Sequence, residues 1–130
     1  MKQIWSVDLG VADAADRLTE ALMRRKFGVL HVHNLKQTLN SKGVPFETEC
    51  RVMEVCNPQQ AAKVLADDID LNMALPCRIS VYEKDGKTQI GMLSPKAMLG
   101  ELSDSAALQS VADEVEATLT DAIEEVSGTH

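Results

Sequence analysis

Two cysteines that lie beside prolines are the residues of this chain best suited to chemistry. Cys56 precedes Asn57 and Pro58, and Cys77 follows Pro76. Asn-Pro is a typical helix start, with asparagine as the N-cap and proline at the first helical position. Free N–H groups and the positive end of a helix stabilise a thiolate or a small bound anion. Cys56 is therefore either a thiol poised for reaction or the last buried residue of its strand, and both interpretations stay open.

The other two cysteines lie within expected strands. Cys77 shares its side of the pleat with apolar residues, while Arg78, Ser80 and Tyr82 face the other side. Cys50 is in line with Val52. Both patterns indicate small buried side chains, so Cys56 is expected to be the most reactive thiol. Cys56 and Cys77 meet only if their strands run antiparallel, because the end of one strand and the start of the other then lie at the same edge. The candidate ligand or thiol site contains Cys56, Asn57, Cys77 and Arg78.

Two histidines suggest a metal site as an alternative. His31 and His33 are two residues apart in an expected strand, so their side chains point to the same face. A zinc site usually needs three or four ligands, and no other histidine or cysteine pair of suitable spacing accompanies them. His130 is the terminal residue. A polar strand face is the simpler interpretation of His31 and His33.

No enzyme motif accompanies these residues. The sequence lacks GxSxG, a phosphate loop, GxGxxG and HExxH, and its carboxylates are too scattered to assign an acid and a base. Enzyme activity is therefore left open, and no cofactor can be named.

Composition excludes several classes of partner. The 130 residues fit a single domain, residues 1–130, and the net charge of −7 argues against binding nucleic acid or anionic membranes. No apolar run is long enough to span a membrane. Three cysteines without a CxxC motif fit a reducing compartment. We expect a soluble cytoplasmic protein.

Periodicity and turn signals predict an α+β fold that positions these residues. Strands are expected at 3–9, 29–33, 47–56, 77–83 and 87–93, and helices at 11–26, 35–42, 58–67, 95–100 and 104–126. Asp85-Gly86 predicts an antiparallel hairpin. The first two strands are expected to form a parallel crossover around the first helix. The order β-α-β-α-β-α-β-β-α-α thus predicts a mixed sheet of about five strands with helices packed on it. The acidic outer face of the last helix is expected to be solvated.

Several segments together resemble the domain of unknown function family 302. They are FGVLHVHNLKQTLNSKG, VMEVCNPQQAAKVLADD, LPCRISVYEKDGKTQIGML and SPKAML, and the resemblance extends from the first helix to the last. It implies a compact α/β domain that forms a homodimer, and no established activity. Members often occur in sulfur-metabolising organisms, which implies thiol or sulfur chemistry. Asn72 and Arg78 depart from the family pattern, where glycine and asparagine are common. Arg78 therefore places a guanidinium beside Cys77 that relatives lack.

Three functions follow from these observations. The first is a non-enzymatic homodimeric module that binds a small ligand or a partner. The second is a thiol-dependent carrier of sulfur or persulfide, or a redox sensor, that uses Cys56 with Cys77. The third is metal binding through Cys56 and Cys77 or through His31 and His33.

Overall fold

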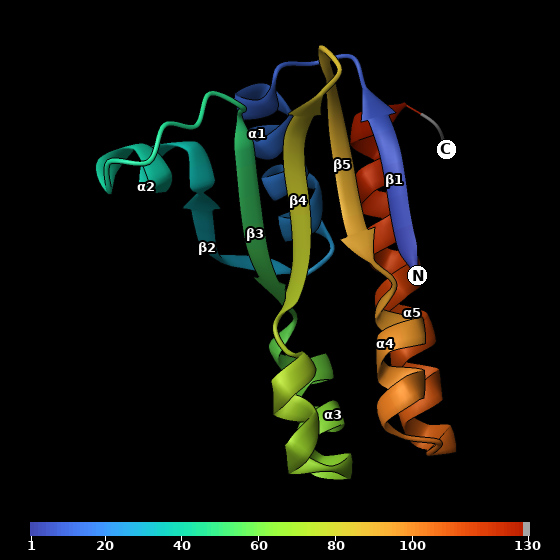
Figure 1. The fold of residues 1–130 in the computed structure, drawn as a ribbon. Helices are drawn as coiled ribbons and strands as arrows, with labels where there is room; N and C mark the ends of the chain where they lie inside the picture. The colour runs from blue at the N-terminus through green and yellow to red at the C-terminus, as the bar shows by residue number, and fades with distance from the viewer. Residues whose placement is uncertain (129–130) are drawn as a thin grey trace.

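The computed structural model describes residues 1–128 and contains a five-stranded sheet with helices packed on it (Figure 1). His130, named above, lies outside the described residues. The elements in chain order are β1 (Lys2–Val7), α1 (Val11–Arg24), β2 (Gly28–Asn34), α2 (Leu35–Ser41), β3 (Cys50–Cys56), α3 (Pro58–Asp67), the 3-10 helix η1 (Ile69–Ala74), β4 (Cys77–Lys84), β5 (Lys87–Leu93), α4 (Pro95–Leu102) and α5 (Ala106–Ser127). The predicted α+β class and order of helices and strands are confirmed, and η1 is an addition.

The sheet has the order β1-β5-β4-β3-β2, and each of these neighbouring pairs is antiparallel. The mixed sheet expected from the sequence is therefore wrong. The strands β1 and β2 do not pair, because α1 carries the chain across the sheet to its opposite edge. The first strand instead pairs with the last, with Lys2 opposite Leu93.

One face of the sheet is covered by helices. In Figure 1 the helices α1 and α5 lie behind the strands. Met53, Ile79 and Ile90 project from the sheet toward these helices and are completely buried. The apolar stripe of α1, at Val11, Ala14, Ala15, Leu18, Ala21 and Leu22, packs in the same cluster, together with the C-terminal half of α5. We call this cluster, between the sheet and the two helices, the sheet cluster. Burial of this apolar surface is the main stabilising term for the sheet.

The opposite face is turned toward the viewer in Figure 1, and α1 and α5 leave it uncovered. We call it the open face. Because side chains alternate along a strand, it carries Lys2, Ile4, Ser6, His31, His33, Cys50, Val52, Glu54, Cys56, Arg78, Ser80, Tyr82, Lys84, Lys87, Gln89, Gly91 and Leu93. Cross-strand pairing aligns Ile4, Gly91, Ser80, Val52 and His33 in one row across all five strands.

A second apolar cluster extends beyond the lower end of the sheet, where Figure 1 shows α3 and α4. This end cluster consists of Val64, Leu71, Leu99, Leu108 and Ala112, from α3, η1, α4 and the N-terminal half of α5. The last helix therefore belongs to both clusters.

Local capping chemistry sets several element boundaries, including the expected helix start after Asn57. Asn34, Asn57 and Ser94 each accept a hydrogen bond from a backbone N–H in the first turn of the helix that follows. Asp85 and Gly86 both have positive φ, at 54° and 77°, which a tight turn between two twisted strands requires.

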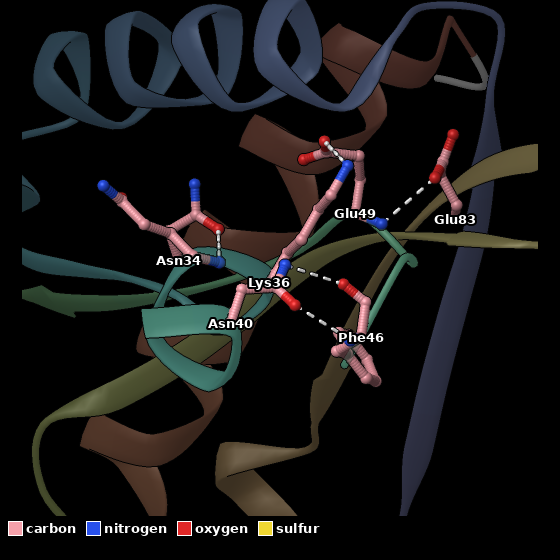
Figure 2. Close-up of polar contacts among 7 residues, drawn as sticks. Asn34, Lys36, Asn40, Phe46, Glu49 and Glu83 are labelled. Atoms are coloured by element: carbon pink, nitrogen blue, oxygen red, sulfur yellow. Dashed lines mark hydrogen bonds and ion pairs between the residues drawn. The ribbon is translucent and has the colours of Figure 1, made fainter. Parts of the chain in front are cut away.

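Side chains also fix the loop between α2 and β3, shown in Figure 2. The amide of Asn40 donates to the carbonyl of Phe46 and accepts from its N–H, at 3.0 Å each. Lys36 Nζ lies 3.1 Å from Glu49 Oε1, and the Glu49 N–H donates to Glu83 on β4. The loop is thereby tied to the upper end of the sheet, away from the Cys56 end.

Candidate functional site

The helix start after Cys56 forms as expected, but it offers no free donors. Pro58 has no N–H, and the N–H groups of Gln59 and Gln60 donate to Asn57 Oδ1 at 3.0 and 3.2 Å. The next N–H, that of Ala61, donates to the Asn57 carbonyl. All donors of the first turn are therefore occupied within the chain. The expectation that free N–H groups would stabilise a Cys56 thiolate is corrected here.

Burial also acts against ionisation of the three thiols. It raises the pKa of Cys50 and of Cys56 above the ordinary cysteine value. It raises the pKa of Cys77 to about 11, with a smaller contribution from a negative charge on Cys56. All three cysteines are free thiols and partly buried. The local environment therefore does not activate Cys56.

The antiparallel pairing of β3 and β4 brings Cys56 and Cys77 to the same end of the sheet. Cys77 lies opposite Val55, the neighbour of Cys56. Alternation places Cys77 on the covered face, where it packs against the sheet cluster. Cys56 belongs to the open face. The strand ends meet, but the two side chains start from opposite faces of the pleat.

The two histidines share the open face, as alternation predicted. Their rings touch edge to face, with centroids 4.3 Å apart. His33 Nε2 lies 2.7 Å from Glu54 Oε2. This hydrogen bond holds the pKa of the Glu54 carboxyl below its ordinary value against the opposing effect of burial, and the charges of His33 and Arg78 add to it. Within residues 1–128, no group of three or more His, Cys, Asp or Glu residues is placed to hold a metal ion.

A groove of about 530 Å³ opens on the lower part of the open face, between η1 and α4. Its floor comes from β1, β3, β4 and β5, and its walls from the chain that enters β4 and the chain that leaves β5. Apolar side chains dominate the lining, and Met73 is 80% exposed at its rim. The lining consists of Lys2, Ile4, Val52, Met73, Ala74, Leu75, Pro76, Cys77, Arg78, Ser80, Tyr82, Gly91, Met92, Leu93, Pro95, Met98 and Leu99.

Gly91 contributes to the depth of the groove. A Cβ at this position would lie 3.5 Å from the Tyr82 ring and hydroxyl and 3.6 Å from the Gln3 carbonyl oxygen. The Tyr82 side chain therefore lies close over the glycine backbone, and the floor stays low at Gly91.

The groove unites only part of the candidate site. Cys77 and Arg78 line it, whereas Cys56 and Asn57 are not among its lining residues. Arg78 lies opposite Glu54 in the β3–β4 pairing. Arg78 is thus the candidate residue that the structure places at a concave surface with its charged group accessible.

Comparisons with known proteins agree with this fold. The family model described as "Domain of unknown function DUF302" matches residues 4–126. The chain belongs to this family. The crystal structure of the uncharacterized conserved protein DUF302 from Bacillus stearothermophilus has 34% sequence identity and a TM-score of 0.90 to the DUF302 chain described here. The match covers 96% of this chain and 97% of that one. No curated protein matches the chain significantly.

Most of the groove in this DUF302 chain was not recognised from the sequence. Alternation in β4 already put Arg78, Ser80 and Tyr82 on one side, but it did not show that this side lacks a helix. The contribution of Lys2 and Ile4 depends on the pairing of the first strand with the last.

Within residues 1–128, no helix is long and apolar enough to cross a membrane.

Proposed function

We propose that the chain is a non-enzymatic binding module whose ligand occupies the groove on the open face. The observation that carries this proposal is a concave apolar surface with a few polar side chains. Ligand sites typically have volumes of roughly 300 to 1,000 Å³ and this kind of lining, and the groove of about 530 Å³ falls in that range. Methionine side chains at its walls, Met73 and Met98, adapt their shape to an apolar ligand.

The thiol alternative has less support. A reactive cysteine needs a stabilised thiolate, whereas burial raises the pKa of Cys56 and the first-turn donors of α3 are occupied.

The three free cysteines fit the reducing cytoplasm, which we propose as the compartment.

Binding of the neutral apolar dye N-phenyl-1-naphthylamine tests the proposed site. The wild-type chain should enhance its fluorescence, and Ser80→Trp should abolish the enhancement because indole fills the groove. Ser6→Trp is the matched control, since Ser6 also belongs to the open face but does not line the groove. Circular dichroism verifies that both variants fold. An unresponsive wild type, or equal binding by Ser80→Trp and wild type, would contradict the proposal.

We also propose that two copies form a homodimer, as the family resemblance implies. The long α5 does not support this, because its apolar residues are covered within the chain by the two clusters. Support comes instead from β2, an edge strand on which Leu30 and Val32 are 62% and 39% exposed. A two-fold contact between such strands buries apolar side chains and pairs free backbone groups.

Light scattering at tens of micromolar tests the homodimer. The wild type should have the mass of a dimer, and Leu30→Lys should have that of a monomer. Leu102→Lys, at a leucine of α4 that is 55% exposed, should leave the dimer intact. A monomeric wild type would rule out the dimer, and a dimeric Leu30→Lys variant would exclude the β2 edge as its contact.

A further inference from the structure

The charges around the groove are unlike those of the rest of the chain. The chain has 20 acidic and 13 basic residues, but the lining contains two cations, Lys2 and Arg78, and no carboxylate. The other polar side chains of the lining are the hydroxyls of Ser80 and Tyr82, whereas the side chain of the lining residue Cys77 belongs to the covered face. Lysine and arginine can only donate hydrogen bonds, and hydroxyls can donate as well. The polar part of this surface is therefore suited to a negatively charged acceptor.

The strand register places both cations at one level of the sheet. Lys2 is directly opposite Leu93 on β5. Ser80 is opposite Gly91 in the antiparallel β4–β5 pair. Two residues toward the start of β4 correspond to two residues toward the end of β5, so Arg78 lies level with Leu93. Lys2 on β1 and Arg78 on β4 thus lie on either side of Leu93, because β5 is the strand between them. Neighbouring strands are about 4.8 Å apart, so the two long side chains can approach one anionic group from both sides.

These donors are available. Within residues 1–128, Lys2, Arg78, Ser80 and Tyr82 form no side-chain hydrogen bond or ion pair. The carboxylate nearest in the register is Glu54, opposite Arg78. Glu54 is hydrogen-bonded to His33, and Arg78 acts on it only through the field of its charge. Arg78 can therefore turn toward the groove without breaking a direct contact.

We infer that the ligand of the groove is a free small anionic amphiphile, with its acidic group between Lys2 and Arg78 and its apolar body along the methionine and leucine side chains of the walls. This inference rests on the proposed function and names the chemical class of its ligand. A free molecule, rather than a lipid within a bilayer, is the chosen source because the net charge of −7 repels an anionic membrane surface.

Three probes with the same ten-carbon chain separate charge from apolar contact: decanoate, 1-decanol and decyltrimethylammonium. Titration calorimetry of the full chain, below micelle-forming concentrations, should give roughly tenfold tighter binding of decanoate than of 1-decanol, the size of one hydrogen bond to a charged group. Decyltrimethylammonium should bind most weakly. Arg78→Gln should remove most of the preference for decanoate and leave 1-decanol unchanged. Arg17→Gln, on the exposed side of α1, is the matched control and should change neither affinity.

The outcomes distinguish this inference from the proposed function. Equal affinity for the three probes, or an undiminished preference in Arg78→Gln, overturns the anionic class while the binding module stands. If 1-decanol and N-phenyl-1-naphthylamine also fail to bind, the proposed function fails with it. Flotation with phosphatidylglycerol vesicles should leave the protein unbound, and co-flotation that requires Arg78 would overturn the choice of a free molecule.

Discussion

The two faces of the sheet are made from the same strands and yet differ in almost every physical respect. On the covered face, Ile79 and Val81 are completely buried against α1 and α5. On the open face, the alternate residues Arg78, Ser80 and Tyr82 line a groove. A single strand thus supplies the core with one set of side chains and the candidate site with the other. The exposed set of β4 side chains can therefore vary without rebuilding the fold.

The most severe test of this comparison replaces the same residue type on each face. Ile79→Ala should lower the free energy of unfolding by about 2–5 kcal/mol, because a fully buried side chain leaves a cavity. Ile4→Ala, where the isoleucine is 45% exposed, should cost about 1 kcal/mol or less. Urea unfolding of both variants measures the difference. Similar costs would mean that something covers the open face in solution.

The rates of thiol labelling at Cys56 and Cys77 compare the open face with the covered face at the lower end of the sheet. With a pKa of about 11, roughly one Cys77 thiol in a thousand is ionised at pH 8. Burial raises the pKa of Cys56 as well, but only for Cys77 is the rise large, so iodoacetamide should label Cys56 faster than Cys77. Peptide mass spectrometry measures each rate against pH, and unfolding in urea should equalise them. If Cys77 reacts as fast as Cys56 in the folded protein, the assignment of these two cysteines to different faces is wrong.

Loss of the Asn57 cap, which lies between the sheet and the end cluster, should have an intermediate effect on the free energy of unfolding. Asn57→Ala should cost roughly 1 kcal/mol, because two N–H groups of α3 lose their acceptor. Lys63→Ala, exposed on the same helix, should be nearly neutral. Equal urea midpoints for the two variants would show that the cap contributes little to holding α3 below the strands.

The smallest expected effect is a change in the pKa of Glu54, a charged residue of the open face. His33→Ala should raise the pKa of Glu54 toward its ordinary value of 4.5, because the main cause of the depression is the His33 hydrogen bond. A depressed carboxyl pKa stabilises the fold above the ordinary pKa, and this contribution disappears as the pH falls through the folded-state value. His31→Ala should shift Glu54 less. Carbon NMR titration of the Glu54 carboxyl reports both changes, and an unmoved pKa in His33→Ala would contradict the assigned hydrogen bond.

The sequence predicted features that depend on near neighbours. The cap at Asn57 and the turn at Asp85-Gly86 formed as expected, because each depends on the chemistry of two to four consecutive residues. Side-chain alternation in β4 was also predicted correctly. These local rules were enough for the α+β class and the order of elements.

Features that depend on contacts between segments far apart in the chain were not predicted from the sequence. The pairing of β1 with β5 brings Lys2 and Ile4 to the groove, and no local pattern marks it. The acidic face of α5 is another case. Glu125 pairs with Arg24 and Arg25 of α1, and Glu116 accepts hydrogen bonds from Ser94 and the Lys96 N–H, so this face is only partly solvated. The helix start at Pro58 was predicted correctly, but Asn57 occupies the donors that had been assigned to a ligand.

The 22-residue helix α5 connects the cores of both regions. A helix of this length extends about 33 Å without interruption. Its N-terminal half anchors α4 and η1, the walls of the groove, while its C-terminal half is fixed under the sheet that forms the floor. The walls and the floor of the groove are consequently packed on one and the same helix. Bending of α5, or local unfolding of its first turns, moves these walls relative to the floor. Amide hydrogen exchange near Leu108 reports that local unfolding.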